Sequence, residues 1–398
     1  TIRVGEARER ILIPVDQKPL FVAFDPGSTI PKTLKFTRPK EMLLAQLKLD
    51  KDCMGRIEAA KQLGKNFDLE AAQALGQALT GDTFWGVQAE VAALLGKIRL
   101  DAVEPMLISA LDQVKHSKAR TAVARALSEF RSDAVADALK KHVLNDESYL
   151  VEATAVGSWV KSTLPRSRPH TPERVAAVDQ FLTKNLTKES HLDLTRAATI
   201  RALGLIPGLE RGEHRAILER LTEWTARGKS TDCRVAAIQA MGALLPWSTP
   251  AVRHQILGVF QEIAEEDSFR IRIALVLALG GSAQPEAIGL LSHIRDIDSD
   301  GRIKRDCQVF ISDLSDTASG GEAVANYDSV EDGAKIVQTA LVVFLVSGAI
   351  LTFERLSRGA AGTTYVTLLG VNDPPTITNL AGDSLAYNEG DGAVVIEQ

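Results

Sequence analysis

Apolar and alanine positions recur with helical spacing in seven ten-residue segments of the chain. The segments superpose without gaps and are GRIEAAKQLG (55–64), VQAEVAALLG (87–96), ARTAVARALS (119–128), VEATAVGSWV (151–160), TRAATIRALG (195–204), CRVAAIQAMG (233–242) and IRIALVLALG (271–280). Apolar side chains three and four positions apart form a stripe on one helix face, and a final glycine or small residue suits a helix C-cap. The segment ends are separated by 32, 32, 32, 44, 38 and 38 residues, and a weaker copy begins at Gly301. The pattern predicts a tandem array of helices.

Start signals for a second set of helices lie between these segments. They are Asp68, Asp101, Asp133, Thr171-Pro172, Thr249-Pro250 and Gln284-Pro285. Two helices per unit of about 40 residues are typical of HEAT or armadillo arrays. Each amphipathic pair buries its stripe only against the next pair, so we predict a mainly α, HEAT-like α-solenoid over residues 39–316. The proline-rich insertion 161–174 predicts a loop, either a contact loop or a plain connection.

The second residue of each segment carries another periodic feature. It is arginine in six of the eight copies, and Gln88 or Glu152 in the others, with an acidic residue often six positions upstream. In HEAT-like repeats such residues commonly pair between neighbouring units. We predict a structural ladder, weakest at Gln88 and Glu152; the alternative is a basic stripe for phosphate or peptide carboxylates. The predicted members are Asp50, Arg56, Asp82, Arg120, Asp146, Arg196, Arg234, Glu266, Arg272, Asp296 and Arg302.

Residues 1–38 lie outside the repeat. Ile11–Val15 and Leu20–Phe24 are short β-rich runs bounded by residues typical of turns. Two strands alone are not stable. We therefore expect them to be the last strands of an upstream β-sandwich, which would make this polypeptide a processed form or a fragment.

The junction between these runs and the repeats resembles a known family. The passage PLFVAFDPGSTIPKTLKFTRPKEMLLAQL (19–47), followed by segment 55–64 and by DTFWGVQAEVAALLGKI (82–98), resembles the C-terminal region of zinc aminopeptidases of the aminopeptidase N type, over about residues 8–315. The resemblance implies a non-catalytic helical portion that shapes peptide access to an upstream, zinc-containing catalytic domain in the cytoplasm. The alternatives are a HEAT-repeat scaffold that holds a protein partner on its concave face, and a fragment of a bacterial surface adhesin.

The chain carries no motif for peptidase chemistry. An H-E-x-x-H helix with a later glutamate would supply three zinc ligands, but the seven histidines never stand four apart. The sequence also lacks G-x-S-x-G, P-loop and dinucleotide-binding motifs. We therefore predict no catalytic residue, no cofactor and no metal site in the repeats, and assign zinc to the presumed upstream domain.

The composition changes after Asp316. Residues 317–335 are small, polar and acidic, which predicts a linker. The uncharged run Ile336–Phe353 is barely long enough to span a membrane, and its β-branched content favours a pair of buried strands. YVTLLGVNDPPTITNLAGDSLAYNEGDGAVVIEQ (365–398) is similar to cadherin-like modules of bacterial surface proteins, so we expect a β-rich tail over 336–398. That resemblance implies export and a weak calcium site at Asn372 and Asp373.

Composition narrows the classes of partner. The chain has 46 Lys+Arg against 51 Asp+Glu and a net charge of −5, so it has no global basic field for nucleic acid or an anionic membrane. Cys53, Cys233 and Cys307 are few, odd in number and widely spaced, which predicts small buried side chains and neither disulfides nor a zinc site. We expect a peptide or protein partner.

Overall fold

The computed structural model describes residues 15, 17–27, 29, 36–65, 68–98, 100–266 and 268–318. These ranges contain sixteen α-helices and three short 3-10 helices. The α-helices are α1 Lys40–Leu49, α2 Cys53–Leu63, α3 Leu69–Gly81, α4 Trp85–Lys97, α5 Val103–Gln113, α6 Ser117–Leu127, α7 Asp133–Asn145, α8 Tyr149–Thr163, α9 Pro172–Asn185, α10 Leu194–Leu203, α11 Arg215–Glu223, α12 Thr231–Leu244, α13 Pro250–Glu262, α14 Phe269–Gly280, α15 Ala287–Ile297 and α16 Gly301–Ala318. The 3-10 helices are η1 His191–Asp193, η2 Leu209–Arg211 and η3 Leu245–Trp247.

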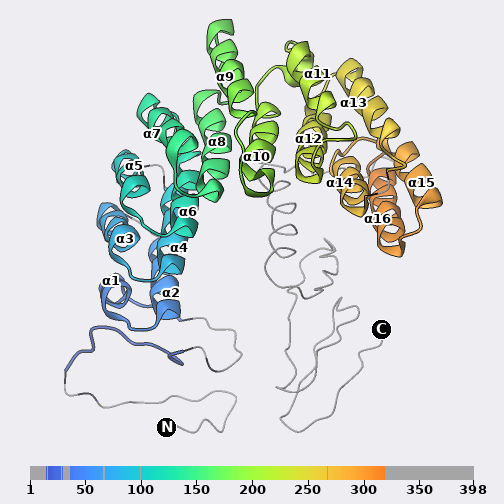
Figure 1. The fold of residues 1–398 in the computed structure, drawn as a ribbon. Coiled ribbons are helices and arrows are strands. Elements are labelled where there is room, and N and C mark those ends of the chain that lie inside the picture. Colours follow the sequence, from blue (N-terminus) through green and yellow to red (C-terminus); the bar gives the residue numbers. More distant parts are fainter. Residues whose placement is uncertain are drawn as a thin grey trace, which may run out of the picture. The chain divides into compact units, whose positions relative to one another are not determined.

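The helices form two layers within residues 36–318. The even-numbered helices, called inner helices here, contain the repeated segments, and each packs against the inner helices before and after it. The odd-numbered, outer helices form the second layer, and Figure 1 shows the inner helices on the inner side of the curved stack. The predicted HEAT-like solenoid is confirmed for this part of the chain.

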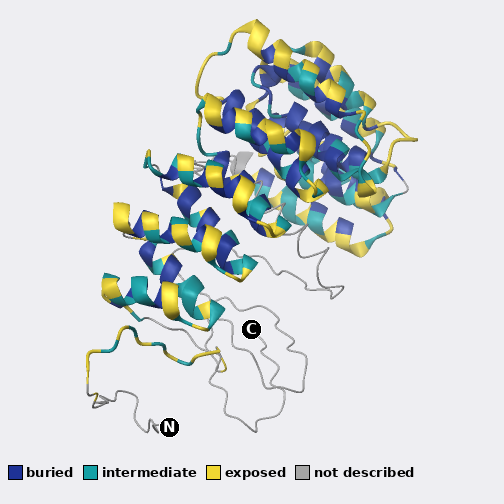
Figure 2. Cartoon of the chain, turned by 60° about the vertical axis from the view of Figure 1, so that its left-hand side comes forward, coloured by how far each residue is buried: buried dark blue, intermediate teal, exposed yellow. Residues whose placement is uncertain are grey.

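The core is a continuous seam between the two layers. The fifth and ninth residues of every repeated segment point into it, from Ala59 and Leu63 in α2 to Leu275 and Leu279 in α14, and all are at most 5% exposed. The seam of buried side chains extends from Leu43 to Leu314, and in Figure 2 the buried positions line the facing sides of the helices. Each unit therefore buries its apolar stripe against its neighbours.

Glycine stands near the end of three inner helices where the next inner helix approaches closely. A Cβ atom placed on Gly242 would lie 2.6 Å from the Cβ of Ala278 and 3.1 Å from its Cα. Gly96 and Gly204 face alanines of the following inner helix in the same way. The absence of a side chain at these positions lets successive backbones pack closely.

Side-chain caps explain several helix starts. The carboxylate of Asp68 accepts a hydrogen bond from the Ala71 amide at 3.0 Å, as predicted. The next expected start, Asp101, lies one residue before Ala102, the N-cap of α5, and this helix start has no side-chain cap. Asp133 is the first residue of α7, because the Ser132 hydroxyl already accepts from the Val135 amide at 3.1 Å.

The predicted loop at 161–174 is shorter than expected. α8 continues through Thr163 and α9 begins at Pro172, so only residues 164–171 connect them. Leu164 is buried in the core seam, which anchors the start of the connection. Proline suits the first position of α9, because it lacks the backbone N–H that would have no helical partner there.

The N-terminal strand prediction is wrong where the structure describes it. Leu20–Phe24 is not a strand, and Leu20 is 69% exposed. An extended segment becomes a strand only by pairing with another, and no strand occurs in the described ranges. The first run, at 11–15, lies almost wholly outside those ranges.

The described chain ends with α16, which includes Thr317 and Ala318, the first two residues of the predicted linker. The rest of that linker, the uncharged run, the expected β-rich tail and the calcium candidates Asn372 and Asp373 lie outside the described residues. None of the described helices is long and apolar enough to cross a membrane.

Candidate interaction surfaces

Two arginine–aspartate pairs join consecutive units as a ladder would. Arg56 donates to both carboxylate oxygens of Asp82, from Nε at 2.6 Å and from Nη2 at 2.8 Å. Arg120 makes the same two bonds to Asp146, at 3.2 and 2.9 Å. Each aspartate is the C-cap of the next outer helix and also accepts from the amide two residues further on. Each pair therefore fixes the turn of one unit to the inner helix of the unit before it.

A third pair has the same geometry but a different acid from the one expected. Arg272 donates from Nε to Asp298 at 2.7 Å, whereas the expected Asp296 lies beside Arg295, with Nε at 2.9 Å from its carboxylate. Asp298 is the C-cap of α15. The acid that pairs with the arginine is the one at the end of the outer helix. The spacing of six residues before the second residue of the next segment indicates Asp296 instead, two positions before Asp298.

The remaining predicted members divide between pairs across units and pairs within one unit. Nη2 of Arg234 lies 2.5 Å from Oε2 of Glu266, 32 residues along the chain. Three others have partners close in sequence: Asp193 for Arg196, Asp300 for Arg302, and Gln46 for Asp50.

Two segments have Gln88 or Glu152 in place of arginine at their second position. Both residues make polar contacts. Gln88 donates to the carbonyl oxygen of Asp82 at 2.9 Å, six residues upstream, as the ladder arginines do. At Glu152 the charges are reversed, because Lys188 of the following unit donates to Oε1 of Glu152, and Thr195 donates to Oε2 at 3.3 Å.

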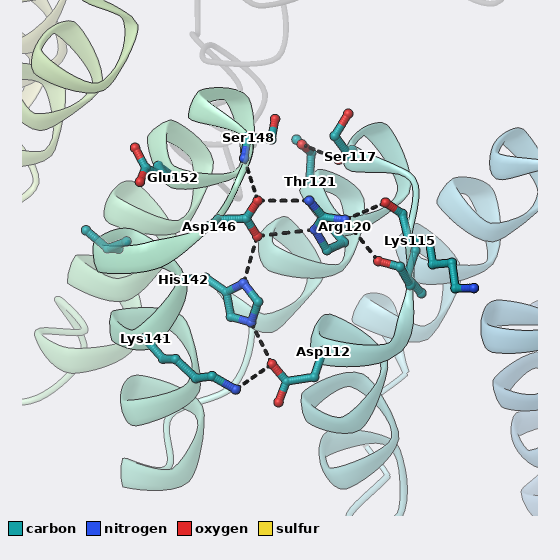
Figure 3. A network of polar contacts seen from close by, with 12 residues as sticks. Asp112, Lys115, Ser117, Arg120, Thr121, Lys141, His142, Asp146, Ser148 and Glu152 are labelled. Carbon is teal, nitrogen blue, oxygen red and sulfur yellow. Dashed lines mark hydrogen bonds and ion pairs between the residues drawn. The ribbon is translucent and has the colours of Figure 1, made fainter. Parts of the chain in front are cut away.

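The side chain of His142 extends the Arg120–Asp146 pair to a neighbouring outer helix (Figure 3). Its Nδ1 lies 2.8 Å from Asp146 and its Nε2 lies 2.9 Å from Asp112, which also accepts from Lys141 at 2.7 Å. The Asp146 side chain is 3% exposed and that of Asp112 is 55% exposed. No role was predicted for His142, although its spacing of four residues before Asp146 is the signal for a pair on one helix face.

The carboxylates of this network are held in the ionised form. Burial raises the pKa of Asp146, but the bonds from Arg120, His142 and the Ser148 amide outweigh burial, and the net shift is downward. Lys141, and then His142, lower the pKa of Asp112. Charged groups joined across α5, α6 and α7 hold these helices together, which is a structural role.

The described residues contain no group of three or more His, Cys, Asp or Glu side chains that could hold a metal. Two of the three cysteines, Cys233 and Cys307, are buried as predicted, and Cys53 is half-buried. Burial raises the pKa of Cys233, and that of Cys307 to about 11, so these thiols are poor nucleophiles at neutral pH.

A hollow of about 380 Å³ lies between α7, α8 and α9. The Trp159 ring on its wall packs against Phe181, with ring centroids 4.5 Å apart. The Lys140 ammonium group lies 5.1 Å from the Phe181 centroid and 5.7 Å from that of Trp159. The two aromatic rings beside this hollow therefore already have a cation–π contact with Lys140 of the same chain.

The seventh residues of the repeated segments form a second surface, called the inner face here. They lie on the side of each inner helix opposite the buried fifth and ninth residues, and so point away from the outer layer. Neighbouring members are close enough to interact, as Nη1 of Arg201 lies 3.4 Å from Oε1 of Gln239. The inner face consists of Lys61, Ala93, Arg125, Gly157, Arg201, Gln239 and Leu277.

Comparison with known proteins supports the helical-repeat class. Residues 72–158, from within α3 to within α8, match the family model for HEAT repeats. No curated protein matches the chain.

Several solved structures align with the chain at low identity. Human deoxyhypusine hydroxylase in complex with glycerol is 18% identical over 69% of this chain and 96% of its own, with a TM-score of 0.31. The CpcE–CpcF complex of phycocyanin lyase from Nostoc sp. PCC7120 is 19% identical over 72% and 98%, with a TM-score of 0.31. A Kap121p mutant is 13% identical over 77% and 35%, with a TM-score of 0.37. Similarity at this level gives no information about the function of the chain. Neither these structures nor the family model supports the resemblance to aminopeptidases or to cadherin-like modules.

Proposed function

We propose that this chain is a HEAT-repeat scaffold that binds a protein partner along its inner face. The observation that supports this proposal most directly is the arrangement of the seventh residues, which form one row across consecutive inner helices and face away from the outer layer. The fifth and ninth residues are used in the core and are not accessible. Among the described residues, the row is therefore the side of the inner helices that is not used in the core.

The spacing of the inner helices supports an extended polypeptide as the bound form. Packed helices lie about 8–10 Å apart, and an extended chain advances about 3.3 Å per residue. A peptide that crosses the inner helices therefore meets a new helix at about every third residue. The ladder pairs of Arg56 and Arg120 hold successive units in a fixed spacing, which reduces the ordering needed on binding.

A pair of glycine substitutions tests this proposal. Gly157 on inner helix α8 and Gly258 on outer helix α13 are both helical glycines, and in the described part of the chain no atom lies within 4 Å of an added Cβ. Peptides are first selected from a displayed random library with the full chain as bait. Gly157→Tyr is expected to weaken binding of the selected peptides at least about tenfold by steric blocking, and Gly258→Tyr is expected to leave it unchanged.

Fluorescence polarisation of labelled selected peptides measures both affinities, and circular dichroism verifies that both variants stay helical. Equal affinities for the two variants, or a loss confined to Gly258→Tyr, would show that the inner face is not the binding surface.

A further inference from the structure

Two arginines on the inner face differ from the other arginines of the described helices. Arg125 on α6 and Arg201 on α10 have no carboxylate within ion-pair distance among the described residues, whereas every other arginine on a described helix has one. Both occupy the seventh position of their segments. Among the arginines of the described helices, the exception is therefore confined to one surface.

The region between these two arginines is open and carries a further cation. Gly157 of α8 is the seventh residue of the intervening segment, and no atom of the described residues lies within 4 Å of an added Cβ. Lys161 stands one turn further along α8 and has no ion pair among the described groups. A bound chain can therefore reach the backbone of α8 between two guanidinium groups.

Both guanidinium groups are partly screened from water by neighbouring atoms, although Arg125 is an exposed residue and Arg201 a half-buried one. This screening lowers the pKa of Arg125 and of Arg201, because a charge that is partly removed from water lacks its full hydration. A guanidinium group presents a planar fork of donors that matches a carboxylate in two-bond geometry. A carboxylate brought to either arginine gains a charge-assisted contact and needs to displace no carboxylate of the described residues.

We propose that the inner face across α6, α8 and α10 binds an acidic, extended segment of a partner protein, with one carboxylate at Arg125 and another at Arg201. Two helix spacings separate the arginines, about 16–20 Å. The two acidic residues of the partner therefore lie about five or six residues apart in an extended chain. This inference rests on the proposed function and names the chemistry of its partner.

Other charges on the surface favour a peptide over nucleic acid. Glu90 on α4 lies 3.5 Å from the inner-face residue Lys61, Glu129 follows Arg125 by four residues, and the chain has a net charge of −5. A continuous phosphate backbone would meet these glutamates, whereas a peptide with spaced carboxylates avoids them.

The test uses a synthetic probe and a charge-matched control. The probe is a fluorescein-labelled Glu-Ser repeat of about twelve residues, which is about 40 Å long when extended, and the same peptide with Gln in place of Glu is its neutral counterpart. The variant is Arg125→Ala with Arg201→Ala. The control is Arg166→Ala with Lys184→Ala, which removes two exposed cations that have no ion pair in the described structure and lie off the inner face.

Polarisation at low salt is expected to show binding of the Glu-Ser peptide and not of the Gln-Ser peptide. The inner-face variant is expected to lose about tenfold in affinity, and the control variant less than about twofold. Equal losses in the two variants would overturn the inference, because binding would then follow net charge. Tighter binding of a single-stranded oligonucleotide at the same arginines would also overturn it.

These outcomes separate this inference from the broader proposal. If Gly157→Tyr blocks the selected peptides but the arginine variant binds every acidic peptide normally, the scaffold proposal stands and the acidic partner is wrong. If Gly157→Tyr has no effect on the selected peptides, the scaffold proposal itself fails.

Discussion

Replacing Asp146 with asparagine is expected to lower the free energy of unfolding by about 3 kcal/mol. The substitution keeps the size of the side chain but leaves the Arg120 guanidinium group, whose side chain is 12% exposed, without its carboxylate. It also removes the carboxylate beside Nδ1 of His142. Removing one partner from a buried ion pair is costly because the other charge stays desolvated. Urea unfolding followed by circular dichroism measures the loss.

Asp112→Asn is the matched control for this effect. It removes the carboxylate at the other end of the same network, where the side chain is 55% exposed, and an exposed pair contributes at most about 1 kcal/mol. Replacing Arg120 with methionine and Asp146 with leucine together is expected to recover most of the stability, since neither charge is then left unpaired. Equal and small losses in the two asparagine variants would show that burial does not set the strength of the network.

The second large effect is expected at Gly242. Glycine to alanine inside a helix ordinarily stabilises it by about 1 kcal/mol. At this site, however, the new methyl group would lie 2.6 Å from the Cβ of Ala278 and 3.1 Å from its Cα. The inner helices α12 and α14 would have to move apart, so we expect Gly242→Ala to destabilise the protein by about 1–3 kcal/mol.

Gly157→Ala provides the comparison, because no described residue other than its chain neighbours has an atom within 4 Å of the added methyl group. This variant is expected to gain about 0.5–1 kcal/mol, so the two substitutions should differ in sign. Thermal and urea unfolding of both variants measure the difference. Stabilisation by Gly242→Ala would mean that α12 and α14 are further apart than the structure shows.

The helical array could be predicted because its physical causes are local. Apolar residues at three- and four-residue spacing define the seam, and glycine marks the end of most segments, so seven of the eight inner helices follow from the sequence alone. The bidentate pairs of Arg56 and Arg120 could also be anticipated, because each aspartate sits at the end of an outer helix, in reach of the unit before it.

Other features depend on relations that no local pattern contains. Asp298 replaces Asp296 because the length of α15 decides where its C-cap falls. The reversed pair of Glu152 and Lys188 joins residues 36 apart across the longest interval of the repeat. The unpaired state of Arg125 and Arg201 becomes visible only when the fold has placed the surrounding carboxylates. The expected strand at Leu20–Phe24 failed because a β-rich run forms a strand only when another strand pairs with it.

Hydrogen exchange of the full chain and of the Asp146→Asn variant tests whether the units are stabilised by their nearest neighbours in single file. We expect faster exchange in α6, α7 and α8 and unchanged exchange in α12 to α16, because the stability of a repeat array is a sum of local terms. A uniform increase in exchange across all the helices would contradict this expectation, since that result would mean that the chain unfolds as a single core.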